Sequence, residues 1–280
     1  MTLNSTEANV PASKKFWKRQ EAGFVYDRQF QNKVGWYIDC SETFPLLELV
    51  QSLKNIKVLD VGCGTGRFLV RFPEPNTLFG VDLSESMLQT TKTKLTRASL
   101  LAASATELPF PDRSFDLVYS VRVIQHIRNQ QKMITELSRV CKPGGRVILV
   151  AYNTWSLLNL YKQIRMSWVG RILNIPFGFI LKEKSFWGKW GFEYDNYCSI
   201  TEIERMMKRS ELQPYYSCGL SSGMPWFLQS FFIGKILHTI APWLLSGLLN
   251  LALFLDRTLA RMGPFKYFMD LVLVVGEKPR

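Results

Sequence analysis

The chain has 280 residues, of which 47% are hydrophobic and 13% aromatic, so it can bury a full core and is too apolar for a disordered protein. Its net charge of +12 suits an anionic partner, yet no run of Lys and Arg forms a polybasic tail. The charge therefore leaves open a solvated basic face, an anionic lipid surface or nucleic acid, with lipid favoured over nucleic acid. The five cysteines form no C-x-x-C pair, which indicates neither a zinc site nor a disulfide framework and favours a reducing compartment.

The first 53 residues are expected to form a polar lead and a helical cap. Residues 1–13 have the composition of a disordered lead, and the segment up to Arg19 has no apolar core. It is therefore not a secretory signal, which predicts a cytoplasmic protein. From Lys14 to Leu53 the spacing of aromatic and aliphatic residues predicts helices.

Residues 58–69 are an apolar run that is broken by Gly62, Gly64 and Gly66, at every second position. This pattern predicts a strand, a tight turn and the start of a helix. The glycines allow positive φ and close approach of a ligand, and a helix start offers unpaired N–H groups to a polar or negative group. A dinucleotide fingerprint, G-x-G-x-x-G, would need glycine where this chain has Arg67. The turn therefore indicates another kind of nucleotide site.

Residues 77–84 predict a second buried strand that ends in an acid, Asp82. A carboxylate at such a strand end can accept two hydrogen bonds from a ribose diol. The alternative role is a helix cap, but Ser84 already offers that cap, with Glu85 in the first turn. We therefore interpret Asp82 as a ribose ligand.

The stretch 108–118 combines two prolines, which fix a loop, with Phe110 and Phe115, which would anchor it, and Asp116 begins a buried strand. A helix then runs to Lys142, a Pro-Gly-Gly turn follows, and a fifth strand begins. Further along, Thr201 is expected to cap a helix over 201–210, before a strand at 213–218.

Together these features resemble the class I S-adenosylmethionine (SAM) dependent methyltransferases. The glycine turn with Asp60 matches E/D-x-G-x-G-x-G, and residues 108–118 match L-P-F-P-D-x-S-F-D-x-V. A strand and short loop ending in His126 add to the match, which covers about residues 55–152. The chain resembles the small-molecule enzymes of this family, including the ubiquinone/menaquinone C-methyltransferase-like group.

The resemblance implies an α/β fold, with a seven-stranded, doubly wound, Rossmann-like sheet. The last strand, at 270–278, would be inserted antiparallel, and a helical N-terminal cap and apolar helical insertions would complete the molecule. The implied parts are a lead and cap at 1–53, a SAM-binding core at 54–152, a basic and aromatic lid at 153–200, and the rest of the sheet at 201–280, with an apolar helical insertion at about 224–262.

By the same resemblance Asp60 would hold the methionine amino end of SAM. Ser104 stands where the family usually has an Asp that binds the adenine amino group, so a hydroxyl would accept that bond. The implied cofactor-binding residues are Asp60, Gly62, Cys63, Gly64, Gly66, Asp82, Leu83, Met87, Ser104 and Ala105. His126 is the candidate general base, and its alternative roles are to order the loop or to contact the acceptor. No metal site is indicated.

The apolar segment 236–255 has 20 residues without Asp, Glu, Lys or Arg, which is long enough to span a bilayer. Pro242 and Gly247 weaken that interpretation, and a polar stripe of Ser246, Asn250, Arg257 and Arg261 recurs at helical spacing. A single span would also separate the final strand from its sheet. The remaining alternatives are a helical lid over the site and helices lying in a membrane interface.

The sequence thus predicts a SAM-dependent methyltransferase acting on a small hydrophobic acceptor, such as a lipid, quinone or isoprenoid. Such an enzyme would be cytoplasmic or peripheral to a membrane, with no nucleic-acid partner. Two alternatives stay open. The first is a nucleic-acid or protein methyltransferase, which the charge suggests, and the second is a SAM-binding or membrane scaffold protein without catalysis.

Overall fold

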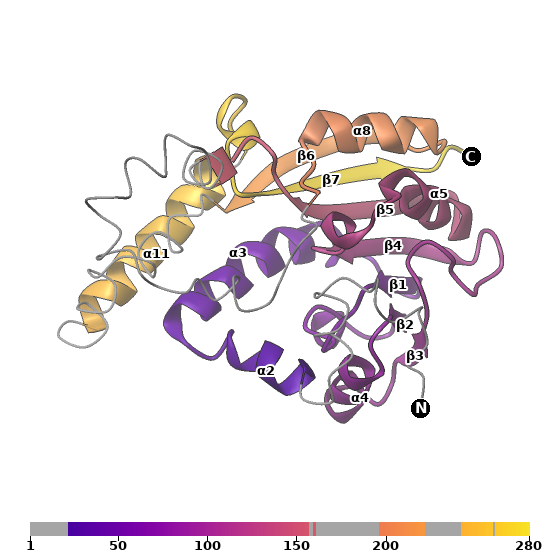
Figure 1. The fold of residues 1–280 in the computed structure, drawn as a ribbon, viewed down its shortest axis with the longest axis horizontal. Helices are drawn as coiled ribbons and strands as arrows, with labels where there is room; N and C mark the ends of the chain where they lie inside the picture. Colours follow the sequence, from indigo (N-terminus) through magenta and orange to yellow (C-terminus); the bar gives the residue numbers. More distant parts are fainter. Residues whose placement is uncertain (1–21, 157–158, 161–195, 222–241, 260) are drawn as a thin grey trace, which may run out of the picture.

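A single mixed sheet organises the chain (Figure 1). The computed structural model describes residues 22–156, 159–160, 196–221, 242–259 and 261–280. The strands run in the order β3-β2-β1-β4-β5-β7-β6. Their bounds are β1 (Lys57–Val61), β2 (Thr77–Asp82), β3 (Ser99–Ala102), β4 (Phe115–Val121), β5 (Cys141–Tyr152), β6 (Gln213–Ser221) and β7 (Leu271–Glu277).

The strand directions confirm the expected fold class. The strands β1 to β5 pair in parallel, whereas β7 lies antiparallel between β5 and β6. The chain leaves β1 toward β2 and β3 and then returns to β4 on the other side of β1. Connections therefore diverge between β1 and β4, and ligands of doubly wound sheets bind in the crevice at the carboxyl ends of such strands.

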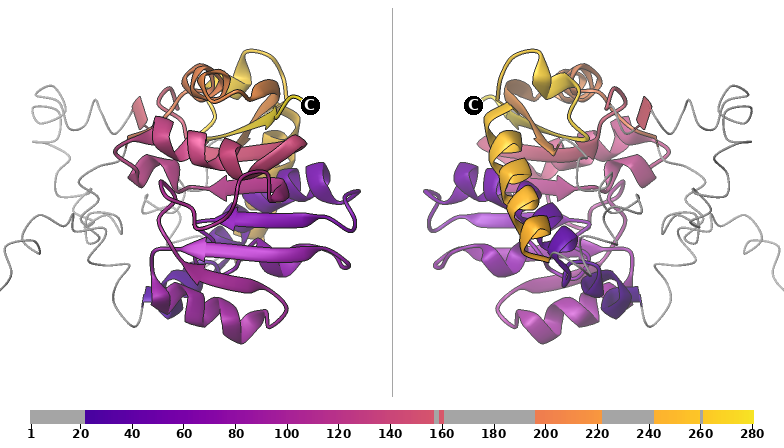
Figure 2. Two further views of the ribbon diagram at one scale, coloured as in Figure 1. Left: turned by 90° about the vertical axis from the view of Figure 1, so that its right-hand side faces the viewer. Right: turned by 90° about the vertical axis from the view of Figure 1, so that its left-hand side faces the viewer.

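Helices cover both faces of the sheet (Figure 2). On one face α5 and α8 bury Met133, Leu137, Ile203 and Met207 against the strands. On the other face, α3 and a short 3₁₀ helix bury Leu46, Val50 and Leu69. The helices are α2 (Ala22–Arg28), α3 (Lys33–Val50), α4 (Glu85–Lys94), α5 (Gln130–Val140), α8 (Ile200–Arg209) and α11 (Pro242–Leu259), with 3₁₀ turns η1 (Leu69–Arg71), η2 (Ile124–His126) and η4 (Phe265–Tyr267).

Capping side chains fix where several helices begin. Asn32 accepts a hydrogen bond from the Gly35 amide at 2.8 Å, and Ser84 caps α4 as expected. The cap that we assigned to Thr201 is wrong, because Ser199 and Glu202 form a reciprocal capping box and the helix begins at Ile200. The box satisfies two backbone donors at once, which is why it decides the start of α8.

The end of α5 also differs from the expectation. The helix stops at Val140, and Cys141 already has extended backbone and pairs with Phe115 of β4. Pro143 disfavours helical backbone at Lys142, so the strand takes over before the Pro-Gly-Gly segment. The turn predicted there is part of β5.

The helix expected after the glycine turn is another correction. The residues beyond Gly66 form turns and then η1, which has three residues and ends at Arg71, before the extended backbone of Phe72. Pro73 disfavours helical backbone at the residue before it, and the positive φ of Gly66 interrupts the backbone upstream. No long helix therefore follows the turn in the segment between Gly66 and β2.

The helix α11 packs along α3 and presents two apolar faces. One face buries Leu245, Leu249 and Leu253 against Val34, Tyr37 and Cys40 of α3. The other face is exposed and consists of Trp243, Leu244, Leu251, Phe254 and Leu255. The predicted polar stripe separates the two faces. Its Ser246 accepts a hydrogen bond from Lys33 at 2.6 Å, and Glu48 pairs with Arg257 at 3.1 Å and with Arg261.

No helix within the described ranges is long and apolar enough to cross a membrane. Most of the predicted lid, at 161–195, lies outside the described residues, as does the part of the apolar insertion before α11, at 222–241.

The packing of α11 on α3 yields a stability prediction. Leu249→Ala removes a side chain that is 1% exposed and should lower the free energy of unfolding by about 2–5 kcal/mol. Leu251→Ala, on the exposed face of the same helix, should change it by no more than about 0.5 kcal/mol. Urea denaturation of both variants checks this, and equal midpoints would show that α11 does not pack on α3 in this way.

Candidate functional site

The glycine turn lies at the carboxyl end of β1, where the sheet connections diverge. Gly62, Gly64 and Gly66 have φ of 78°, 54° and 73°, so all three adopt the left-handed conformation that glycine favours. A Cβ on Gly62 or Gly66 would collide with Val123 or Thr91, whereas one on Gly64 would meet nothing within 4 Å. Packing therefore accounts for two of the glycines, and Gly64 faces open space that a ligand can approach.

Asp82 lies at the end of the neighbouring strand and is held by the turn. Its Oδ2 accepts a hydrogen bond from the Gly64 amide at 2.8 Å, and its Oδ1 accepts one from the Ser84 amide at 2.9 Å. Burial raises the pKa of Asp82, while these two amides act against that shift. The carboxylate thus fixes the turn against β2 at the carboxyl edge of the sheet.

Asp60 is the buried acid of the site, with 1% of its surface exposed. Burial raises its pKa to about 8, although the Tyr119 hydroxyl donates to Oδ2 at 2.9 Å and lowers it in part. Asp60 is therefore mostly protonated at pH 7. A cation placed beside it would favour the ionised form.

The other predicted ligands fall into two groups. Leu83 is 52% exposed beside Asp82, and Ser104 is half-buried, with its Oγ 2.9 Å from the Thr106 hydroxyl. By contrast Met87, Cys63 and Ala105 are buried, and burial raises the pKa of the Cys63 thiol well above its usual value. The first two present open surface to a ligand, whereas the other three, exposed by 9% or less, offer a ligand only a small part of their surface.

His126 ends η2, in the segment that follows β4. Its Nε2 lies 3.2 Å from the side-chain amide nitrogen of Gln125, a contact that is a hydrogen bond when Nε2 is unprotonated. Burial lowers the pKa of His126 to about 4, and Arg122 acts in the same direction. The imidazole is therefore neutral at pH 7 and a weaker base than usual. This arrangement favours the loop-ordering role over that of general base, which stays a prediction.

The loop at 108–118 is anchored as expected. The rings of Phe79, Phe110 and Phe115 pack edge to face, with centroids 4.9 to 6.0 Å apart. Arg139 of α5 adds contacts that the sequence did not indicate, because it donates to the carbonyl oxygens of Leu108 and Phe110 at 2.9 and 2.8 Å. The loop is thus held rigid between β2 and α5.

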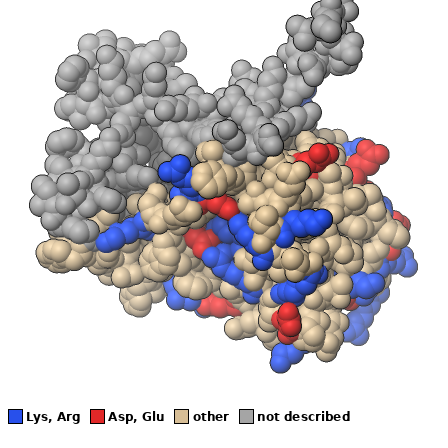
Figure 3. All heavy atoms as spheres, turned by 90° about the horizontal axis from the view of Figure 1, so that it is seen from below, with Lys and Arg blue, Asp and Glu red and all other residues tan. Residues whose placement is uncertain are grey.

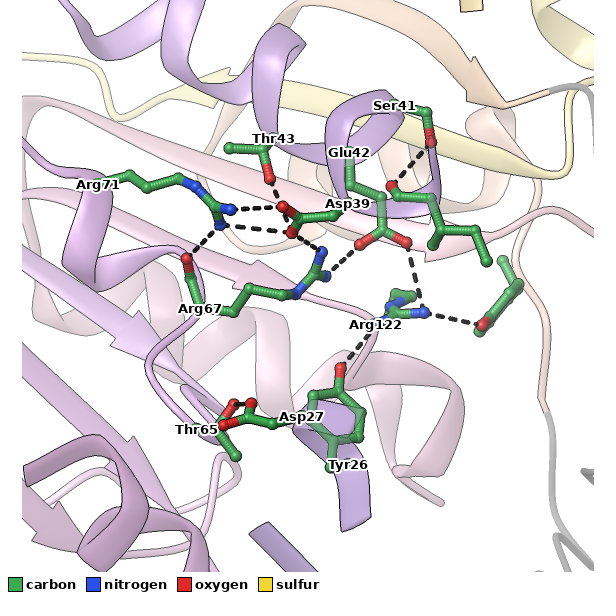
Figure 4. A network of polar contacts seen from close by, with 12 residues as sticks. Tyr26, Asp27, Asp39, Ser41, Glu42, Thr43, Thr65, Arg67, Arg71 and Arg122 are labelled. Carbon is green, nitrogen blue, oxygen red and sulfur yellow. Dashed lines mark hydrogen bonds and ion pairs between the residues drawn. The ribbon is translucent and has the colours of Figure 1, made fainter. Parts of the chain in front are cut away.

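A buried network of charges joins the N-terminal helices to the site (Figure 4). Asp39 and Glu42 of α3 both pair with Arg67, which follows the glycine turn, and Asp39 also pairs with Arg71. The Arg67 guanidinium carbon lies 4.3 Å from the ring centroids of both Phe30 and Phe68. Because Glu42 is fully buried, this pairing fixes α3 on the turn.

The short helix α2 is fixed to the turn in a similar way. Asp27 accepts a hydrogen bond from the Thr65 hydroxyl at 2.6 Å and pairs with Lys94 of α4. Tyr26, one residue earlier, accepts a hydrogen bond from Arg122 at 2.7 Å. The N-terminal cap thus contacts both β1 and β4 at their carboxyl ends.

Sequence reasoning missed the network formed by Asp39, Glu42, Arg67, Arg71 and Arg122. Arg67 served only to exclude a dinucleotide fingerprint, and for the segment from Lys14 to Leu53, which contains Asp39 and Glu42, the sequence predicted helices without contacts to the site. One signal was available, because two acids three residues apart on a predicted helix share one face. Nothing in the sequence showed that this face is buried.

Residues 59–149 match the family model described as a methyltransferase domain. The malonyl-[acyl-carrier protein] O-methyltransferase of Buchnera aphidicola is 37% identical over 121 residues, which are 43% of this chain and 49% of that protein. The ubiquinone/menaquinone biosynthesis C-methyltransferase of Psychromonas ingrahamii is 32% identical over 111 residues, which are 36% of this chain and 44% of that protein. The chain thus spans about half the length of these relatives or less.

Solved structures extend the similarity of fold to most of the chain. A SAM-dependent methyltransferase of Thermotoga maritima, a possible histamine N-methyltransferase, aligns with a TM-score of 0.61 at 17% identity and covers 94% of this chain and 99% of its own. Phosphoethanolamine N-methyltransferase 2 of Haemonchus contortus, in complex with SAM, aligns with a TM-score of 0.60 at 20% identity, over 97% of this chain and 61% of its own.

Glu42 and Glu48 give a matched test of the network, since both lie on α3 and both pair with two arginines. Glu42→Gln leaves Arg67 and Arg122 short of a buried carboxylate and should lower the free energy of unfolding by about 3–5 kcal/mol. Glu48→Gln loses exposed pairs only and should cost at most about 1 kcal/mol. Denaturant unfolding measures both, and similar losses would contradict the burial of Glu42.

Proposed function

Because the chain belongs to the class I SAM-dependent methyltransferases, we propose that it transfers the methyl group of SAM to a small hydrophobic acceptor. The observation that carries this proposal is the open face of Gly64 between Asp60 and Asp82 at the carboxyl edge of the sheet. An intact turn and two acids at the strand ends argue against a scaffold that has lost its ligand.

The residues present fit the cofactor. Asp60 would hold the positively charged amino end of methionine, and Asp82 would accept hydrogen bonds from the ribose hydroxyls. Leu83 and Met87 would flank the adenine, with Ser104 and Ala105 at its polar edge. SAM supplies an activated methyl on a sulfonium centre, so the protein has only to align the acceptor and exclude water.

Few side chains need to act chemically in such a reaction. The neutral imidazole of His126 can accept a proton, and we keep it as the candidate base for an acceptor that loses one. The rings of Tyr152 and Tyr197, with centroids 5.4 Å apart, lie near the end of β5. This arrangement supports an apolar, flat acceptor. The relative named for ubiquinone and menaquinone biosynthesis supports the same class.

A nucleic-acid or protein acceptor is the second candidate, which the charge of +12 favours and to which the relative named for malonyl-[acyl-carrier protein] also points. On the face shown in Figure 3, Lys and Arg side chains are spread out and interspersed with Asp and Glu. A continuous basic stripe, which would suit a phosphate backbone, is not seen on that face.

The exposed apolar face of α11 supports the proposal that the enzyme acts at a membrane surface. Trp243 is 75% and Phe254 is 65% exposed, and the other members of the face are Leu244, Leu251 and Leu255. Arg257 borders this face, next to Arg261 and Lys266 beyond the helix end. Apolar side chains with flanking basic groups suit an anionic lipid surface. We therefore propose a cytoplasmic enzyme that is peripheral to a membrane.

The raised pKa of Asp60 predicts that SAM binding releases a proton. Near pH 7 the carboxyl is mostly protonated, and a bound cation would lower its pKa, so close to one proton should leave. At pH 9 the group is already ionised, and the release should vanish. Titration calorimetry in buffers of different ionisation enthalpy measures it, with Asp60→Asn as the control for protons that SAM itself exchanges. Absence of SAM binding would refute the proposed function.

A second experiment tests the acceptor and the surface together. Vesicles made from a total lipid extract, incubated with the enzyme and methyl-labelled SAM, should gain label in the organic phase. Phe254→Glu should reduce that label several-fold, because it places a charge on the apolar face of α11. Gln89→Glu adds the same charge on exposed α4 and should have no effect. Label confined to the aqueous phase would contradict a lipid acceptor. If Phe254→Glu gave as much label in the organic phase as the unmodified protein, the proposed attachment through α11 would be wrong.

A further inference from the structure

The function proposed above leaves Arg122 without a role, although this residue directly follows β4 at the carboxyl edge of the sheet. Its φ of 56° is a left-handed conformation that residues other than glycine rarely adopt. Such conformations persist where the surrounding structure demands them, and they cluster at functional sites. The backbone is held there because the Arg122 amide donates to the Val150 carbonyl oxygen at 2.8 Å.

The charge of Arg122 is only weakly matched among the described residues. Its nearest carboxylate, Glu42, lies 3.3 Å away, and that oxygen makes no hydrogen bond, because the contact lacks the required geometry. The other oxygen of Glu42 is taken by Arg67. The hydrogen bonds of Arg122 go to two phenol oxygens instead, at 2.7 Å on Tyr26 and at 3.3 Å on Tyr152.

The balance of charges in the whole network also indicates that Arg122 is only weakly matched. Three guanidinium groups, of Arg67, Arg71 and Arg122, face two carboxylates, of Asp39 and Glu42. Asp39 pairs with both Arg67 and Arg71. Arg122, at the end of the network, therefore has to share the carboxylate of Glu42 with Arg67 (Figure 4). A guanidinium bonds a carboxylate more strongly than it bonds a neutral phenol. An incoming anion would therefore form stronger hydrogen bonds with Arg122 than the two phenols do.

The surroundings of Arg122 indicate the shape of such an anion. Phe30 lies beside its guanidinium, at 5.8 Å from the ring centroid, and the ring of Tyr152 packs against that of Tyr197 with the planes tilted by 33°. The side chain of Arg122 keeps 11% of its surface exposed, whereas Glu42 keeps none. Arg122 is thus the member of this pair whose side chain keeps some exposed surface, and the ring of Phe30 lies beside its guanidinium.

From this geometry we propose that Arg122 binds an anionic oxygen group, a carboxylate or a phenolate, carried by a flat apolar methyl acceptor. The proposal rests on the function proposed above and narrows its acceptor class. If the ribose of the cofactor lies at Asp82 of β2 and its methionine at Asp60 of β1, the acceptor approaches from the β4 side, where Arg122 is located.

The test uses the full chain saturated with S-adenosylhomocysteine, titrated with benzoate and with its neutral isostere benzamide. We expect benzoate to bind at least tenfold more tightly, Arg122→Gln to abolish the preference, and Arg122→Lys to keep part of it. Arg71→Gln alters the same network without touching the phenols and should keep the full preference. Equal affinities in the unmodified protein, or a preference that survives Arg122→Gln, would overturn the proposal.

A second comparison separates the acceptor from the cofactor as the source of the anion. SAM and decarboxylated SAM are titrated into the unmodified protein and into Arg122→Gln. We expect the substitution to leave both affinities unchanged. If it weakens SAM but not the decarboxylated form, Arg122 holds the cofactor's carboxylate and the proposal is wrong. If the unmodified protein binds neither form, the proposed function itself fails.

Discussion

The arrangement of the site depends on the buried ion pairs that Arg67 makes with Asp39 and Glu42. A carboxylate without exposed surface is tolerated only beside a positive partner, and a guanidinium at 8% exposure needs acceptors in return. The pairs that satisfy both sides hold α3 on the glycine turn. Phe30 and Phe68 enclose the same guanidinium and extend the constraint to the segment between α2 and α3. The walls of the crevice are therefore set by charge as much as by apolar packing.

Much of the fold could be predicted because its signals are local. Apolar runs, the string at 108–118 and the glycine spacing each identify an element without knowledge of its neighbours, and the antiparallel last strand followed from the family resemblance. The predicted boundaries of helices were wrong where two local signals competed. Ser199 outcompeted Thr201 as a cap, and Pro143 ended α5 earlier than the helical pattern implied. The prediction of a helix after the glycine turn was wrong for a related reason, because Pro73 follows within one turn of η1.

The site was predictable only in part, because half of it depends on contacts between distant segments. The predicted cofactor-binding residues follow from motif positions at the ends of three neighbouring strands. The pairs of Arg122 with Glu42 and Tyr26 join residues that are far apart in sequence, and nothing local marks them. The same holds for Tyr119, whose hydroxyl contacts Asp60 from the adjacent strand. Residue type alone cannot show that an acid on an amphipathic helix is buried.

The exposed face of α11 also bears on how an acceptor is supplied. Apolar molecules are scarce in water and abundant in lipid, so an enzyme that collects them from solution is limited by their arrival. With α11 on a lipid surface, the search becomes diffusion in two dimensions, at a local concentration set by the bilayer. Because the other face of α11 packs on α3, and α3 is fixed to the glycine turn, attachment would also hold the crevice at a constant height above the lipid. The depth of the reactive atom of the acceptor would then contribute to selectivity.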